Sequence, residues 1–455
     1  MLKQAGRCVQ MLLLVLLAAG PLQAQSQAQT QAPIAEKAPA QEAAQAQPKV
    51  AAPVPSQIIA KPPALEQAKG APQGSLVIIG GGLRTETTPV WQRIVELAGG
   101  KGARIAVFGS ASHNPDKAAL LDVEHLNAHG ADAFVVPVAV KLAGSDYRVA
   151  AEDPALGASV RAATGAFFVG GDQARITQAL RRPDGSATLM LDSLWDMYRR
   201  GGVIAGTSAG AAIMSKTMFY HVSSVLSTLK RGVADGMEMA PGLGFIGDDV
   251  FVDQHLLVRG RFARMLPAMM AKDYKVGLGI DENTAMVIHA NRDVEVVGYK
   301  GALLIDLSGA TSEAGNFNVS NAKLSYLDNG DRYNLTSHVF TPSPDKLAGK
   351  FDPARPYYRG PLFSADILGH TTVVDMMTKL IDSDQIDAVG VAFGSPRDLQ
   401  PDLGFEFRLS RVPESVGYAS TIADAYSVYN IRLDVLPIQI RQPLYQYQTN
   451  QAQPK

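Results

Sequence analysis

The stretch GGVIAGTSAGAAIMS at residues 201–215 joins a short apolar run, a serine between glycines and a run of small residues. The apolar run at 203–205 has no polar position, which is typical of a strand buried on both faces of a parallel sheet. Residues 206–210 form the pattern G-x-S-x-G, whose glycines permit a tight strand-to-helix turn that lifts the serine hydroxyl above the sheet. Ser208 is therefore a candidate nucleophile, although serine is also favoured as the N-cap of a helix.

Similar apolar runs precede this stretch, and amphipathic, helix-like segments lie between them. The runs are LVII at 76–79, RIAVF at 104–108, AFVVPV at 133–138 and AFFV at 166–169. Strands that alternate with helices predict an α/β fold, with a doubly wound, mostly parallel sheet and helices on both faces. Several runs end in glycine-rich turns, so we expect the functional site at the carboxyl edge of this sheet. The turn Gly-Gly-Gly at 80–82 lacks the spacing of a dinucleotide-binding motif.

Composition and charge exclude some classes of protein. With 455 residues, of which 46% are hydrophobic, the chain can bury a substantial core. Its 42 Lys and Arg residues balance 43 Asp and Glu residues, so it lacks the basic footprint of a nucleic-acid-binding protein. Nucleic acid is therefore not an expected partner.

The N-terminal residues have the pattern of an exported protein. Residues 1–24 combine two basic residues, a short apolar stretch and a small-residue end, which is typical of a signal peptide, with an uncleaved anchor as the alternative. Residues 25–72 are mostly Ala, Gln and Pro, which predicts a disordered linker. The one cysteine, Cys8, lies in the signal, so cleavage leaves no disulfide and no thiol nucleophile. The expected destination is the periplasm or the medium, with no stable membrane span after cleavage.

The remaining chain is predicted to form two regions. Residues 73–345 carry the strand and serine patterns and read as a catalytic domain, and residues 346–455 read as a small C-terminal α+β extension. Strand-like pairs at 293–308 and at 322–337 are each expected to form a hairpin.

A serine nucleophile needs a base, and His255 has the most chemical neighbours of the eight histidines. It ends the strand-like FVDQH, and a helix-like segment with three arginines follows it. The alternative is a strand-end histidine beside a solvated face. A carboxylate should orient the imidazole, and Asp281 and Glu282 in GLGIDENTA are both candidates, although Asp-Glu-Asn is also ordinary turn chemistry.

Four motifs together carry a family resemblance: FVGGDQ at 168–173, GTSAGA at 206–211, DQHLLVRGRFARML at 253–266 and GLGIDENTA at 277–285. In this order and spacing they resemble the cyanophycinases, which belong to a serine peptidase family that also includes the aspartyl dipeptidases. The core of that family is similar to class I glutamine amidotransferases. The resemblance covers about residues 74–340.

The resemblance implies a role for each motif. It implies a triad of Ser208, His255 and Glu282, with no metal and no organic cofactor. An oxyanion hole is expected from backbone N–H groups of Gly171 and Ala209. The substrate pocket would contain Gln173, Asp253, Gln254, Arg259, Arg261 and Arg264, whose guanidinium groups suit carboxylates. Asp253 is left with two interpretations, contact with a substrate guanidinium or an internal pair with one of the arginines.

The resemblance also implies a reaction. Cyanophycin is multi-L-arginyl-poly-L-aspartate, and the family hydrolyses this polymer to β-Asp-Arg dipeptides through an acyl-enzyme. The signal, linker and extension make the chain similar to a secreted form of the enzyme. The alternatives are a related serine peptidase that acts on other aspartyl or isoaspartyl peptides, and a non-catalytic, polymer-binding relative. A homodimer is a further expectation.

Overall fold

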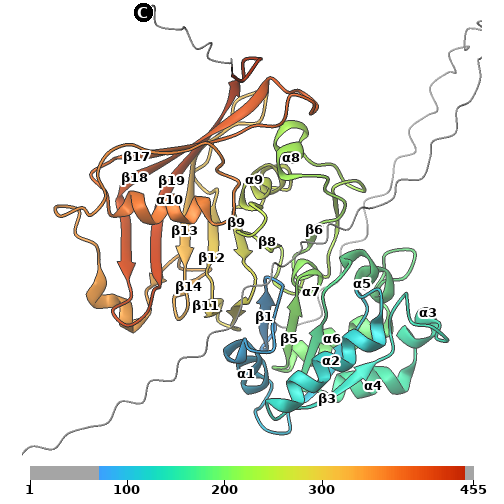
Figure 1. Ribbon diagram of the computed structural model, residues 1–455. Helices are drawn as coiled ribbons and strands as arrows, with labels where there is room; N and C mark the ends of the chain where they lie inside the picture. Colours follow the sequence, from blue (N-terminus) through green and yellow to red (C-terminus); the bar gives the residue numbers. More distant parts are fainter. Residues whose placement is uncertain (1–70, 446–455) are drawn as a thin grey trace, which may run out of the picture. The chain divides into compact units, whose positions relative to one another are not determined.

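The computed structural model describes residues 71–445, which belong to one compact unit (Figure 1). The predicted signal at 1–24 and nearly all of the predicted linker at 25–72 lie outside the described residues. Within the described range, no helix is both long enough and apolar enough to cross a membrane. These residues form two large sheets and a two-stranded sheet made of β6 (Thr217–Phe219) and β7 (Met239–Pro241).

The nine-stranded sheet contains all five apolar runs that were predicted as strands, and these strands are parallel to one another. Their order is β3 (Asp132–Val136), β2 (Arg104–Phe108), β4 (Gly165–Phe168), β5 (Val203–Thr207) and β1 (Ser75–Ile79). Beyond β1 the sheet continues with antiparallel strands β10 (Thr284–Ile288), β11 (Asp293–Gly298), β14 (Arg332–Asn334) and β15 (Phe340–Thr341). The predicted α/β class is confirmed, with a sheet that is parallel in one part and antiparallel in the other.

Helices cover both faces of the parallel part. They are α1 (Thr88–Leu97), α2 (Pro115–Ala128), α3 (Tyr147–Ala151), α4 (Pro154–Ala162), α5 (Gln173–Leu180), α6 (Leu189–Arg199) and α7 (Ala209–Ala212). Trp91 of α1 stacks on Phe167 of β4, with ring centroids 5.5 Å apart. Gly210 of α7 instead lies against Phe168. Because neighbouring residues of a strand point to opposite faces, α1 and α7 lie on opposite sides of the sheet.

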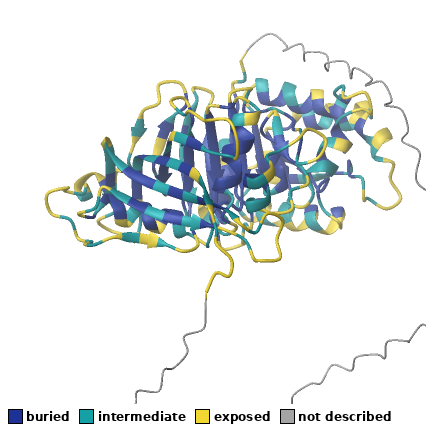
Figure 2. Cartoon of the chain, turned by 90° about the horizontal axis from the view of Figure 1, so that it is seen from above, coloured by how far each residue is buried: buried dark blue, intermediate teal, exposed yellow. Residues whose placement is uncertain are grey.

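The second large sheet has eight strands and is mostly antiparallel. Its order is β16 (Leu362–Ser364), β17 (Asp387–Ala392), β18 (Leu403–Ala419), β19 (Tyr426–Gln439), β13 (Val319–Leu327), β12 (Ala302–Asp306), β9 (Val276–Ile280) and β8 (Val250–Gln254). The helices of this part are α8 (Val225–Arg231), α9 (Phe262–Ala271), α10 (Thr372–Ile381) and the 3₁₀ helix η1 (Pro344–Gly349). Figure 2 shows that buried residues concentrate in the strands of both sheets and that exposed residues lie mainly in the loops.

The chain passes directly between the two large sheets four times, and two of these crossings correct predictions. The pairs at 293–308 and 322–337, predicted as hairpins, are not hairpins. β11 pairs with β10 and β14 in one sheet, whereas β12 and β13 pair in the other. The turn residues between these strands are compatible with a hairpin, but each strand finds its partners elsewhere in the chain. A third crossing, at residues 281–283, joins β9 to β10.

Residues beyond 345 share the second sheet with residues before it. β19 pairs along β13, and β8 and β9 lie at the far edge of the same sheet. Phe262 of α9 packs against Phe407 of β18, with ring centroids 5.7 Å apart. The boundary between a domain at 73–345 and an extension at 346–455 stays a prediction, and these contacts cross it.

Candidate active site

Ser208 lies in a sharp turn between β5 and α7. Its φ is 53°, and its N–H donates to the carbonyl of Ile79 at 3.0 Å. A Cβ added at Gly206 would lie 2.3 Å from the carbonyl oxygen of Gly210, and one added at Gly210 would lie 2.4 Å from the carbonyl oxygen of Phe168. Both glycines of the G-x-S-x-G pattern are therefore required by close backbone contacts. The Ser208 side chain does not cap α7, since it makes no hydrogen bond to the N–H groups of that helix.

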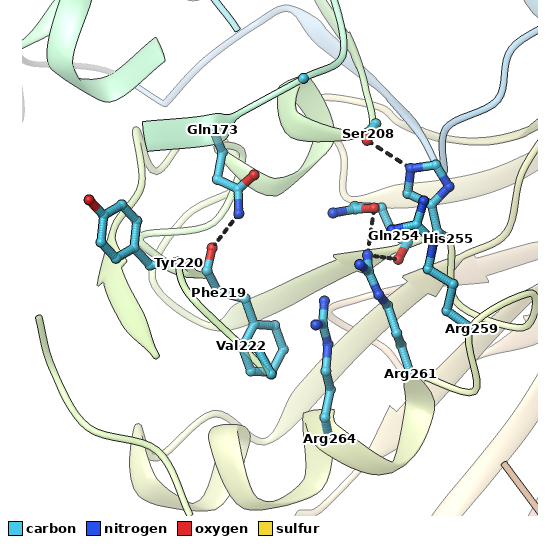
Figure 3. Close-up of a pocket in the computed structure, with 11 residues that line it drawn as sticks. Gln173, Ser208, Phe219, Tyr220, Val222, Gln254, His255, Arg259, Arg261 and Arg264 are labelled. Atoms are coloured by element: carbon cyan, nitrogen blue, oxygen red, sulfur yellow. Dashed lines mark hydrogen bonds between the residues drawn. The ribbon is translucent and has the colours of Figure 1, made fainter. Parts of the chain in front are cut away.

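The Ser208 hydroxyl instead faces His255. Ser208 Oγ lies 2.8 Å from His255 Nε2, and His255 Nδ1 lies 2.6 Å from Glu282 Oε1 (Figure 3 draws the first of these bonds). His255 follows β8 with φ of 49°, and Glu282 lies in the crossing between β9 and β10. An ionised carboxylate only accepts hydrogen bonds, so Glu282 holds the proton on Nδ1 and leaves Nε2 to accept from Ser208. The three residues predicted as a triad thus lie in one hydrogen-bonded chain.

The Gly-Gly-Gly turn after β1 lies against this chain, a role that the sequence did not reveal. His255 N–H donates to the carbonyl of Gly80 at 2.7 Å. A Cβ added at Gly81, where φ is 112°, would lie 2.3 Å from His255 Cε1. One added at Gly82 would lie 2.9 Å from Glu282 Oε2. These glycines leave room for the imidazole and for the carboxylate that orients it.

The surroundings of His255 and Glu282 set their protonation states. Burial lowers the pKa of His255 below its ordinary value of 6.5; the hydrogen bond to Glu282 opposes this shift, and the positive charges of Arg259 and Arg261 add to it. Burial raises the pKa of Glu282, but the hydrogen bond and charge of His255 and the charges of Lys300 and Arg259 outweigh it, so that the net shift is downward. At neutral pH the imidazole is neutral and the carboxylate is ionised, as a general base and its partner must be.

The backbone groups predicted as an oxyanion hole lie beside Ser208. Ala209 directly follows it, and Gly171 lines the same pocket. Among the described residues, neither N–H makes a backbone hydrogen bond outside the helices and strands. Gly171 has φ of 145°, and an added Cβ there would lie 2.2 Å from the carbonyl oxygen of Ala111. Neither N–H is therefore committed to a backbone partner of this kind, and the oxyanion hole stays a prediction.

The predicted arginines take three different positions. Arg264 is buried and forms a two-bond ion pair with Asp253, with both N···O distances 2.7 Å, and its guanidinium lies 4.1 Å from the ring centre of Phe219. Arg261 donates to the carbonyl and the side-chain oxygen of Gln254, both at 2.8 Å, and burial lowers its pKa to about 10. Asp253 is thus engaged internally.

Arg259 is the exposed member of the group. Within residues 71–445, it makes no ion pair and no hydrogen bond. Of the three arginines, only Arg264 forms an ion pair with a carboxylate among the residues that the structure describes, so the charges of Arg259 and Arg261 are less fully compensated. These two charges make the pocket suited to a negatively charged group.

The pocket that these groups line has a volume of about 280 Å³ and opens at Ser208 (Figure 3). Gln173 lies on its wall and donates to the carbonyl of Phe219 at 2.8 Å. Phe219, Tyr220 and Val222, at and after the end of β6, complete the lining. Sequence reasoning missed these three residues because that loop carries no recognisable motif. Asp253 does not line the pocket, whereas the other predicted binding residues do.

Comparison with known proteins identifies the family. Residues 76–296 match peptidase family S51. The cyanophycinase of Geminocystis herdmanii (strain PCC 6308) is 34% identical over 277 residues, which are 58% of this chain and 95% of that protein. The cyanophycinase of Synechococcus elongatus is 32% identical over 250 residues, 53% of this chain and 73% of that protein.

Among solved structures, a peptidase from an acI-B1 Actinobacterium is 20% identical, with a TM-score of 0.43, over 58% of this chain and 98% of that one. The relationship to the curated proteins is strong enough to assign a family, and the matched residues contain Ser208, His255 and Glu282. The chain belongs to peptidase family S51, as a serine-type peptidase similar to the cyanophycinases.

Proposed function

We propose that the protein hydrolyses cyanophycin to β-Asp-Arg dipeptides. The observation that carries this proposal is a hydrogen-bonded Ser208–His255–Glu282 chain that opens into a pocket with two unneutralised arginines. The cyanophycinase relatives support the choice of substrate, since they match over most of their own length. The polymer presents both carboxylates and arginine guanidinium groups. A binding site for it therefore needs cations for the carboxylates and polar or anionic groups for the guanidinium groups.

The geometry supports an acyl-transfer mechanism. Ser208 Oγ attacks the scissile carbonyl carbon while His255 Nε2 takes the hydroxyl proton, and the N–H groups of Gly171 and Ala209 stabilise the oxyanion. His255 then gives the proton to the leaving amine, which breaks the C–N bond and leaves an acyl-enzyme. Water, deprotonated by His255, hydrolyses the ester and frees Ser208. Glu282 keeps the imidazole oriented and stabilises its protonated form.

The pocket supports binding of the substrate by its carboxylates. Among residues 71–445, Arg259 and Arg261 form no ion pair with a carboxylate, and a guanidinium binds a carboxylate through two parallel hydrogen bonds. Arg264 and Asp253 neutralise each other and hold the wall of the pocket. A substrate arginine would therefore meet neutral polar groups such as Gln173, with Asp253 already engaged.

The test is incubation of the purified protein and of a Ser208→Ala variant with cyanophycin, followed by mass analysis of the soluble products. We expect β-Asp-Arg from the wild type, and a loss of several orders of magnitude in the variant because the nucleophile is gone. If neither protein released the dipeptide, the substrate proposal would fail. A panel of isoaspartyl and aspartyl peptides would then identify the bond that is cleaved.

Export is part of the same proposal, because cyanophycin outside the cell requires an exported enzyme. The sequence pattern of residues 1–24 is its support. N-terminal sequencing of the protein recovered from periplasm or medium should begin near residue 25. A retained residue 1 would contradict cleavage.

A further inference from the structure

The crossing at residues 281–283 connects the two large sheets, and its three side chains point to three different parts of the site. Glu282 contacts His255. Asn283 Oδ1 accepts from the N–H of Arg84 at 3.1 Å and from the hydroxyl of Thr87 at 2.9 Å, in the segment that follows β1. Asp281 turns toward the segment that follows β8. The proposed mechanism uses only the first of these three contacts.

Asp281 is fully buried and binds the backbone just beyond His255. Its Oδ1 accepts from the N–H groups of Leu257 and Val258, each at 3.2 Å. Those residues are two and three positions after His255, which itself has the unfavourable φ of 49°. Such a conformation persists only where the surroundings fix it. The carboxylate therefore fixes the turn that carries the imidazole.

Lys300 provides the counter-charge. Its Nζ lies 3.4 Å from Asp281 Oδ2, an oxygen with no hydrogen-bond partner among the described residues. Lys300 comes from the crossing between β11 and β12, and its backbone N–H and carbonyl both bond to the hydroxyl of Thr284, at 2.9 Å and 2.6 Å. Thr284 is the first residue of β10, directly after the crossing at 281–283, so these bonds hold Lys300 close to that crossing. Its cation lies beside a carboxylate that would otherwise be buried and uncompensated.

We propose that Asp281, with Lys300 as its counter-ion, is a positioning residue that keeps His255 aligned between Ser208 and Glu282. Asp281 touches neither the pocket nor a reacting atom, so it acts only through the backbone at 255–258. A carboxylate is suited to this position because one charged oxygen serves two N–H donors. The inference rests on the triad chemistry of the proposed function, and its test separates the two.

The test measures how fast a fluorophosphonate probe labels Ser208 in the full-length protein. The serine oxygen displaces fluoride from phosphorus while His255 takes the hydroxyl proton, so the rate reports the alignment of His255 without any need for the substrate pocket. For Asp281→Asn we expect a rate lower by about 100-fold, the loss typical of a misplaced catalytic group. With the natural substrate, kcat should fall while KM changes little.

Asp331→Asn is the matched control. Asp331 is as buried as Asp281 and also pairs with a lysine, Lys346, at 2.9 Å, but it lies between β13 and β14. This variant should lower Tm and label at the wild-type rate, with both rates measured well below each Tm. A role of Asp281 in stability alone would make the two variants behave alike.

Lys300→Met gives a second, independent measurement. It leaves the Asp281 carboxylate without its cation, so labelling should slow by about 10-fold or more. Lys300 also lowers the pKa of Glu282, so the rates are compared at neutral pH or above, where Glu282 is ionised in either protein. There the double variant should be no slower than Asp281→Asn by more than about twofold, because Lys300 then acts through Asp281. This variant decides the question if Asp281→Asn does not fold.

Each outcome bears on one proposal. Wild-type protein that is not labelled at Ser208 would overturn the triad chemistry itself. If the wild type is labelled, and Asp281→Asn or Lys300→Met is labelled at the same rate, the positioning role is overturned. The triad chemistry then still stands.

Discussion

Ser208 and His255 both have a positive φ, 53° and 49°, which non-glycine residues rarely adopt. Each such conformation costs a non-glycine residue about 1–3 kcal/mol and persists only where other contacts impose it. Here the contacts are backbone bonds: Ser208 N–H donates to Ile79, and His255 N–H donates to Gly80. The last residue of β1 and the glycine after it thus help to fix two strained residues, and the side chains of Ser208 and His255 meet at 2.8 Å.

The loss of activity at acid pH, which is the acid limb of the pH profile, should follow the protonation of His255. The imidazole must be neutral to accept the serine proton, so activity is present above the pKa of His255 and is lost as pH falls through it. Because burial lowers this pKa, the limb should lie below 6.5. Arg259 contributes to the lowering, so Arg259→Gln should move the limb to higher pH.

This shift can be measured as the pH dependence of Ser208 labelling, which does not require substrate binding. Arg355→Gln is the control, since Arg355 is also exposed but pairs with Asp352 beyond the matched family residues. A limb that stays in place in Arg259→Gln would mean that the charge of Arg259 does not contribute to the pKa of His255.

The site could be predicted from sequence only where a motif fixes the residue. Ser208 and His255 each follow a strand, and the G-x-S-x-G spacing and the D-Q-H motif identify them. The choice between Asp281 and Glu282 is different, because two adjacent carboxylates on an irregular crossing can each face either way. The pairing of Asp253 with Arg264 likewise depends on the distance between β8 and α9, which no local pattern encodes.

At the scale of elements, the loop after β1 needs a glycine at position 81 because the His255 ring lies against it. Gly81→Ala would place a methyl group on the His255 ring, so labelling of Ser208 should fall by about 100-fold through displacement of the base. Gly99→Ala is a close control: its φ is 113° against 112° at Gly81, but nothing lies within 4 Å of an added Cβ.

Both variants carry the same backbone cost, on the order of 1 kcal/mol, and Gly81→Ala adds the cost of displacing the His255 ring. Only Gly81→Ala should lose labelling. Equal labelling rates in the two variants, measured by mass spectrometry, would contradict the contact with His255.

The positions of the strands in the sequence were easier to predict than the pairing of the strands in the sheets. The five apolar runs are strands because their residues suit burial on both faces, which is a local property. The two predicted hairpins were wrong because β11 pairs with β10 and β14 in one sheet, whereas β12 and β13 pair with each other in the other sheet. Thr284, whose hydroxyl bonds to both backbone groups of Lys300, begins β10 directly after a crossing between sheets that looks like an ordinary turn in sequence.

At the scale of the whole molecule, residues after 345 support the pocket. A Cβ added at Gly260, between Arg259 and Arg261, would lie 2.1 Å from the carbonyl oxygen of Leu368. Lys230 of α8, the helix after the pocket-lining loop, donates to the carbonyls of Leu399 and Gln400 at 3.1 Å and 2.6 Å. The C-terminal segment therefore contacts two walls of the site from outside it.

A chain that ends at residue 345 should consequently fail to fold as a peptidase. The truncation would remove β19, which pairs with β13, and Phe407, which packs against Phe262. It would also leave buried Asp331 without Lys346. Each lost core side chain contributes about 1.5–3 kcal/mol, and a domain has only about 5–15 kcal/mol of stability in total.

A chain that ends at Leu444 is the control, because it keeps every strand of the second sheet. It should be soluble, unfold cooperatively and label at Ser208 at the wild-type rate, whereas the chain ending at 345 should do none of these. A shorter chain that unfolded cooperatively and was labelled would mean that residues 73–345 are an independent domain. The predicted boundary would then hold despite the shared sheet, and the contacts at Gly260 and Lys230 would be dispensable for the site.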